Sequence, residues 1–117
     1  MADRIIEEKT LEFAVRIVKF YRYLVAEKKE YVISKQILRS GTSIGANVRE
    51  SRNAQSSADF INKLNIALKE ADETQYWLEL MKRAEIIKTN QFESLNKDLI
   101  EIIAMLTTSI KTLKKNK

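Results

Sequence analysis

Residues 39–47 read "RSGTSIGAN" and hold both glycines of the chain, Gly41 and Gly45, four residues apart. The flanking segments, "YVISKQIL" (31–38) and "VRESRNAQ" (48–55), have helical character, and the chain contains no proline that would break a helix. The glycines therefore lie inside a helix. Each of them costs that helix about 1 kcal/mol relative to alanine, so a compensating contact is expected in the folded protein.

Both glycines fall within the apolar stripe of this helix. A residue advances by about 100° around a helix axis, which places Gly41 among Ile37, Ile44 and Val48 and Gly45 about 40° away. A glycine in that position lets a bulky neighbour such as Phe or Trp approach the backbone. A glycine loop for phosphate does not fit, because no strand precedes the glycines and no Gly-Lys-Ser/Thr follows them. We interpret Gly41 and Gly45 as helix-packing residues.

The rest of the chain repeats apolar residues at helical spacing, interrupted by three short polar segments. We predict four helices, over 5–26, 31–52, 58–87 and 91–113. Two of their starts carry capping signals, Ser56 with Asp59 and Asn90 with Glu93. Because short connections make consecutive helices antiparallel neighbours, the sequence predicts an all-α fold, an up-down-up-down antiparallel four-helix bundle. It forms a single domain over 1–117 with a basic C-terminal tail at 111–117.

Three predicted helices carry a clear core stripe. The stripe residues are Ile6, Phe13, Ile17, Phe20 and Leu24 in the first helix; Phe60, Leu64, Ala67, Leu68, Ala71, Gln75 and Leu78 in the third; and Phe92, Leu95, Leu99, Ile103, Leu106, Ile110 and Leu113 in the fourth. The third helix also has apolar residues on its far side, including the only tryptophan of the chain. These are Ile66, Tyr76, Trp77, Leu80 and Ile87.

A second apolar face on a helix marks an interaction surface, although Trp77 could instead lie at the edge of a wide core. The outer side of the second helix offers small and basic side chains that fit such a face. We predict a head-to-tail contact that closes into a cyclic homo-oligomer, with Arg39 paired to Glu70 or Glu73 of a neighbouring copy. The predicted interface residues are Arg39, Ser43, Ala46, Ile66, Glu70, Glu73, Tyr76, Trp77 and Leu80.

The composition argues against an enzyme. The chain has no histidine and no cysteine, which removes the commonest catalytic bases, nucleophiles and transition-metal ligands. A carboxylate site for magnesium at Glu70, Asp72 and Glu73 is disfavoured because Asp72 points to another side of its helix. We predict a non-enzymatic protein without metal or cofactor. No segment is apolar enough to span a membrane and the N-terminal residues are charged, so we expect a cytoplasmic protein with no membrane contact.

The charge is positive, with 21 basic against 16 acidic residues and a net charge of +5. The excess lies mainly between Lys9 and Arg52 and in the lysine tail. Such an excess fits an anionic partner such as RNA or DNA, and the alternative is an ordinary solvated helical surface. Candidate phosphate contacts are Arg16, Lys19, Arg22, Lys28, Lys29, Lys35, Arg49 and Arg52. Tyrosines interspersed among them at 21, 23 and 31 could stack on bases.

Three segments carry a resemblance to a known family: "LEFAVRIVKFYRYL" (11–24), "ILRSGTSIGANVRES" (37–51) and "DFINKLNIALKEADETQYWLELM" (59–81). They resemble the four-helix-bundle proteins encoded in intervening sequences of bacterial 23S rRNA genes. The resemblance implies a pentameric ring and no ribosomal role. It also implies a likeness to accessory proteins of diversity-generating retroelements, whose basic barrel binds nucleic acid and a reverse transcriptase. Arg49 departs from the acidic residues common in relatives.

We therefore expect a ring-forming, non-enzymatic protein that binds nucleic acid through basic surfaces without strong sequence preference. The alternative is a protein-interaction scaffold that docks another protein and no nucleic acid.

Overall fold

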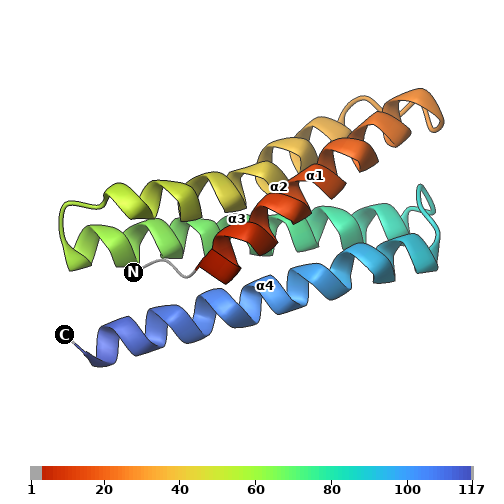
Figure 1. Ribbon diagram of the computed structural model, residues 1–117. Helices are drawn as coiled ribbons and strands as arrows, with labels where there is room; N and C mark the ends of the chain where they lie inside the picture. Colours follow the sequence, from red (N-terminus) through yellow and green to blue (C-terminus); the bar gives the residue numbers. More distant parts are fainter. Residues whose placement is uncertain (1–3, 117) are drawn as a thin grey trace.

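The computed structural model describes residues 4–116 and consists of four long helices (Figure 1). The helices are α1 (Arg4–Ala26), α2 (Ile33–Glu50), α3 (Ser57–Arg83) and α4 (Thr89–Lys115), and a short 3-10 helix η1 (Ser51–Asn53) follows α2. Consecutive helices run antiparallel, so the α1–α2 and α3–α4 turns meet at one end and α4 ends at the other (Figure 1). The all-α four-helix bundle is confirmed. Within residues 4–116, no helix combines the length and apolarity needed to cross a bilayer.

The predicted stripes form most of the core. All five stripe residues of α1 are buried, as are Leu64, Ala67, Ala71 and Leu78 of α3 and Leu95, Leu99, Leu106 and Ile110 of α4. Ile61, Met81 and Ile102 join them, while the remaining predicted stripe residues of α3 and α4 are only partly buried. Full burial of one such aliphatic or aromatic side chain stabilises the fold by about 1.5–3 kcal/mol.

The prediction that Ile87 lies on an outer face is wrong. α3 ends at Arg83, four residues earlier than predicted, and the chain turns with Glu85 at a φ of 62°. This turn directs Ile87 back into the core, where it is only 5% exposed.

The contact that compensates for the two glycines comes from α1. A Cβ atom at Gly41 would lie 2.8 Å from Ile17 Cγ1, and one at Gly45 would lie 3.2 Å from the backbone oxygen of Thr10. The close helix approach is confirmed, but the neighbours are an isoleucine and a backbone carbonyl rather than Phe or Trp. The glycines thus allow the backbone of α2 to approach the Ile17 side chain and the Thr10 backbone of α1 closely.

The start of α3 follows the predicted capping pattern. Ser56 Oγ accepts a hydrogen bond from the backbone N–H of Asp59 at 3.0 Å, and Asp59 Oδ2 accepts one from the N–H of Gln55 at 3.2 Å. The two side chains therefore satisfy two backbone donors at this helix start, although Asp59 bonds to Gln55, the residue before the N-cap, rather than to Ser56 itself.

The starts of α2 and α4 differ from prediction. α2 begins at Ile33 rather than Tyr31, because the Glu30 carboxylate accepts from the N–H groups of Val32, Ile33 and Ser34 at 3.2, 3.1 and 2.7 Å. α4 begins at Thr89, two residues before the predicted Gln91, so the predicted capping role of Asn90 is wrong. Gln91 Oε1 accepts the backbone N–H of Lys88 at 2.8 Å, and this bond fixes the earlier start.

Candidate nucleic-acid interface

The eight predicted phosphate contacts fall into two groups. Arg16, Arg49 and Arg52 form ion pairs within the chain. The other five form no ion pair with any residue in the described range 4–116, and they lie in the last turns of α1, the α1–α2 turn and the first turn of α2. These five are Lys19, Arg22, Lys28, Lys29 and Lys35.

Arg49 and Arg52 both pair with Glu7 of α1. Arg52 Nε donates to Glu7 Oε2 at 2.9 Å, and Arg49 Nε lies 3.4 Å from Glu7 Oε1. The hydrogen bond from Arg52 is the main cause that holds the pKa of Glu7 below its ordinary value. The two arginines thus tie α1 to the end of α2 and to η1.

Arg16 ties α1 to α4. Its guanidinium donates to Asp98 Oδ2 at 2.7 Å, to Ser94 Oγ at 2.7 Å and to the Ser94 backbone oxygen at 3.2 Å. Lys9 lies 3.4 Å from the same aspartate. Burial would raise the pKa of Asp98, but the hydrogen bonds from Arg16 and Lys9 outweigh burial and lower it.

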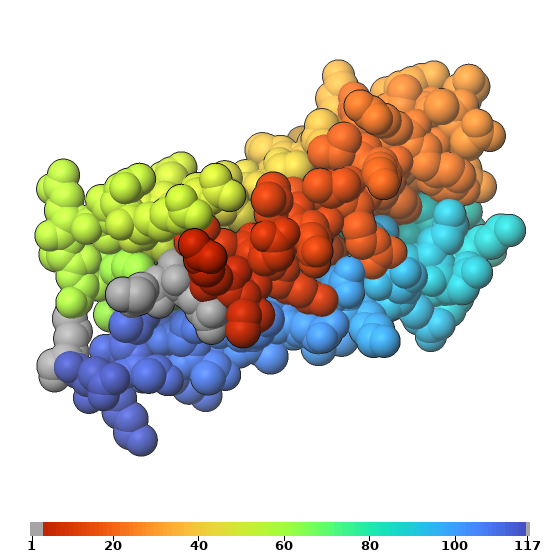
Figure 2. Space-filling view, viewed as in Figure 1, coloured from red at the N-terminus to blue at the C-terminus, as the bar shows by residue number. Residues whose placement is uncertain are grey.

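The α1–α2 turn combines exposed lysines with exposed apolar side chains. Lys28 and Lys29 are exposed, Tyr31 is 53% exposed and Val32 is 72% exposed. This turn forms a projecting corner of the molecule (orange in Figure 2). An aromatic ring among unpaired cations is typical of surfaces that bind single-stranded nucleic acid.

The three tyrosines predicted to stack on bases are not equivalent. Tyr21 and Tyr23 are half-buried, and the Tyr23 ring stacks on Phe20 at 6.4 Å between centroids. Only Tyr31 of the three is exposed.

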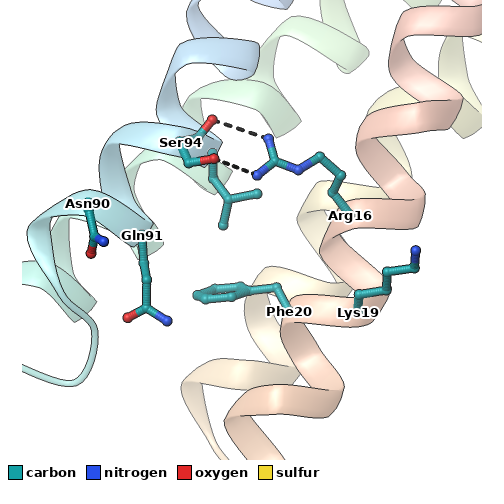
Figure 3. A pocket seen from close by; sticks show the side chains of 7 residues that line it. Arg16, Lys19, Phe20, Asn90, Gln91 and Ser94 are labelled. Atoms are coloured by element: carbon teal, nitrogen blue, oxygen red, sulfur yellow. Dashed lines mark hydrogen bonds between the residues drawn. The ribbon is translucent and has the colours of Figure 1, made fainter.

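A groove of about 570 Å³ lies between α1 and the first turns of α4 (Figure 3). Its lining residues are Arg16, Lys19, Phe20, Asn90, Gln91, Ser94 and Leu95. Sequence reasoning singled out the two basic residues but missed the polar residues of α4. No local pattern identifies them, because only the packing of α1 on α4 brings them beside Lys19.

The expected pairing of Arg39 with a neighbouring copy is corrected by the structure. Arg39 pairs with Glu70 and Glu73 of its own chain, at 3.2 Å for Glu70 Oε1, because α2 and α3 are packed side by side. Glu73 Oε2 also accepts a hydrogen bond from Trp77 Nε1 at 3.0 Å. These bonds, first that from Arg39 and then that from Trp77, lower the pKa of Glu73.

Trp77 on the outer face of α3 is neither fully exposed, as in an interface, nor fully buried, as in a core. Trp77 is half-buried and packs against the core, while Tyr76 is 59% exposed and packs edge-on against it at 5.1 Å. Ile66 and Leu80 are half-buried. The face is therefore a narrow aromatic ridge with Tyr76 at its crest.

The small residues on the outer side of α2 border a second, smaller groove. Its volume is about 250 Å³, and its apolar part is formed by Leu11 and Ala14 of α1 with Gly45 and Ala46 of α2. Ala46 is exposed, and the half-buried Ser43 donates its hydroxyl to a backbone oxygen in its own helix. In the described part of the chain, no three carboxylates gather as ligands for a metal ion.

Comparison with known proteins agrees with the resemblance in the motif segments. The family model of the 23S rRNA-intervening sequence protein matches residues 2–108. A crystal structure of a protein with unknown function from the S23 ribosomal protein family, from Bacteroides thetaiotaomicron, is 64% identical, with a TM-score of 0.92 over 95% of this chain and 99% of that one. None of the curated proteins matches the chain. The chain belongs to the 23S rRNA-intervening sequence protein family.

Proposed function

We propose that this protein is non-enzymatic and binds RNA or DNA through the α1–α2 end of the bundle, without strong sequence preference. The observation that carries this proposal is the gathering of the five unpaired cations there, beside the exposed ring of Tyr31. A cation already held by a carboxylate gains little from a phosphate, whereas an unpaired one releases counterions when it neutralises a phosphate.

The expected binding is weak in sequence preference and steep in salt. Each neutralised phosphate contributes about −0.9 to the log–log salt slope on duplex DNA and about −0.7 on single strands. Stacking of a base on Tyr31 would add about 1–3 kcal/mol on a single strand. A single strand is therefore the better partner for this surface.

We also propose that copies assemble head to tail into a ring. Two features support the assembly: the Tyr76 ridge on α3 and the apolar groove that Leu11 and Ala46 border between α1 and α2. Because Arg39 pairs within its own chain, the contact between copies would be apolar rather than ionic. Resemblance to the family implies five subunits, and symmetry would then repeat the basic end around the ring.

Binding is tested by removing three positive charges at the α1–α2 end and, in a second variant, three at the opposite end, and by comparing the two affinities. The variant Lys28→Gln, Lys29→Gln, Lys35→Gln should lower affinity for every RNA and DNA tested, with a shallower salt slope. The matched control, Lys111→Gln, Lys114→Gln, Lys115→Gln, removes three charges at the opposite end and should have a smaller effect. No binding by the unmodified protein at about 50 mM salt would contradict the proposal and favour the protein-docking scaffold.

Assembly is tested separately by sizing and native mass spectrometry. The protein should run as a multiple of 13.6 kDa. The substitution Tyr76→Ala should weaken assembly without lowering the melting temperature of the subunit, because aromatic anchors commonly contribute about 2 kcal/mol or more to an interface. A monomer at every concentration would exclude the ring.

A further inference from the structure

We propose that the groove between α1 and α4 holds one unpaired nucleotide, either within a single strand or free in solution. This inference rests on the proposed function and adds a specific site and a ligand class to it. α1 diverges from α4 toward the α1–α2 turn (Figure 1), and Lys19, one of the five unpaired cations of the basic end, lines the groove.

The size and the wall of the groove fit a nucleotide. Its volume of about 570 Å³ lies within the range of small-ligand pockets, about 300–1,000 Å³. Phe20 lines it with the small accessible part of its ring, which is 8% exposed, and the Tyr23 ring stacks on Phe20 with an inclination of only 20°. A base that is released from a helix can rest against such an aromatic wall, whereas a paired and stacked base in a duplex cannot reach it.

The polar groups of the groove are mainly hydrogen-bond donors. Gln91 Oε1 is occupied by the N–H of Lys88, so the amide offers its Nε2 group, which Figure 3 shows on the side of Phe20. Ser94 Oγ accepts from Arg16, which leaves its hydroxyl proton free to donate. Lys19 contributes an ammonium group that forms no ion pair with the described residues. The Asp98 carboxylate, which Arg16 also contacts, is neutralised by Arg16 and Lys9.

This set of donors selects for acceptors. Phosphate oxygens suit the ammonium of Lys19, and a carbonyl oxygen on the base suits the amide of Gln91. Uracil, thymine, cytosine and guanine carry such a carbonyl, whereas adenine carries none. The groove should therefore favour oligouridine over oligoadenosine, and single strands over duplexes.

The decisive variant is Gln91→Glu in the full chain. A glutamate can still accept the N–H of Lys88, so α4 keeps its start, but it presents a negatively charged acceptor to the groove in place of a donor. Labelled oligouridine, oligoadenosine and a duplex are titrated by fluorescence anisotropy. Oligouridine affinity should fall about tenfold, and duplex affinity should change far less. Lys19→Gln should also weaken oligouridine binding more than Lys97→Gln, which removes one charge from an exposed part of α4 outside the groove.

A second measurement separates the two sources of the nucleotide. Uridine monophosphate is titrated into the unmodified protein and followed by amide NMR. Shifts confined to residues 16–20 and 90–95 would establish that the groove binds a free nucleotide. If these shifts are absent while oligouridine affinity still depends on Gln91, the groove binds a nucleotide only as part of a strand. If the protein binds strands but both groove variants behave like Lys97→Gln, the groove inference fails and the proposed function stands. If no strand binds at low salt, the proposed function fails, and the groove inference fails with it unless the NMR shifts are present.

Discussion

The two ends of the bundle are both rich in basic side chains, but they use their carboxylates differently. At the α2–α3 end, Glu7 pairs with Arg49 and Arg52. At the α1–α2 end, Glu30 accepts three backbone N–H groups at the start of α2, and Lys28 and Lys29 form no ion pair with any described residue. Glu27 lies in the same turn, is exposed and forms no ion pair with the described residues.

The difference teaches that net charge does not identify a binding surface. Both ends carry predicted phosphate contacts, yet Arg49 and Arg52 at the α2–α3 end are held by Glu7, whereas Lys28, Lys29 and Lys35 at the α1–α2 end form no ion pair with the described residues. The position of a nearby glutamate relative to a helix start or to a guanidinium decides which cations are available. Three substitutions break or sharpen this comparison.

The largest effect on stability is expected at Gly41, which lies in the α1–α2 contact between the two ends of the bundle. The substitution Gly41→Leu should lower the free energy of unfolding by about 1–3 kcal/mol, because the space is already filled by Ile17. Urea denaturation of the subunit measures this change. The control Gln36→Leu places the same side chain at an exposed position of α2 and should be close to neutral.

Undiminished stability of the Gly41 variant would mean that α1 can move away from α2. The α1–α2 contact would then not fix the two ends of the bundle relative to each other, and the structure could not be used to compare them.

The sequence predicted the features of the fold that depend on local rules. Helical periodicity identified the α1 stripe and placed the glycines toward a neighbouring helix, and Ser56 with Asp59 identified the start of α3. The sequence-based prediction failed at the start of α4, where Asn90 looked like the N-cap but Gln91 caps the helix through Lys88. It also failed at Ile87, because a turn at Glu85 redirects the chain into the core.

The availability of each cation could not be predicted from sequence for a different reason. Arg52 and Glu7 are 45 residues apart, and Arg16 and Asp98 are 82 residues apart. Their pairing depends on which helix faces meet and in what register, which is tertiary information. The same reason applies to the groove, because Lys19 and Gln91 become neighbours only in the folded bundle.

An intermediate effect is expected at Glu30. Burial would raise the pKa of Glu30, but the backbone N–H donors outweigh burial and lower it from its ordinary 4.5. A lowered pKa means that the carboxylate stabilises the fold above the unfolded-state pKa and that this stability is lost as the pH falls through the folded-state value. The substitution Glu30→Gln should therefore reduce stability at neutral pH by about 1 kcal/mol, and the difference from the unmodified protein should shrink in acid.

Thermal or urea unfolding from neutral to acidic pH measures this difference. The matched control is Glu27→Gln, which removes the same charge from the same turn without touching a helix start. If both variants lose equal stability, Glu30 acts through general electrostatics, and its assignment as a helix cap at the α1–α2 end is wrong.

The smallest effect, and the most direct test of the comparison, is expected at Glu7. The substitution Glu7→Gln removes the carboxylate that pairs with Arg49 and Arg52, so the α2–α3 end should come to resemble the α1–α2 end. Nucleic-acid affinity at low salt should rise about threefold with a steeper salt slope, because two more cations can neutralise phosphates. The matched control is Glu12→Gln, which removes an exposed acid of α1 that forms no ion pair with the described residues. An equal gain in both variants would show that only net charge matters, and pairing would then not explain why the two ends differ.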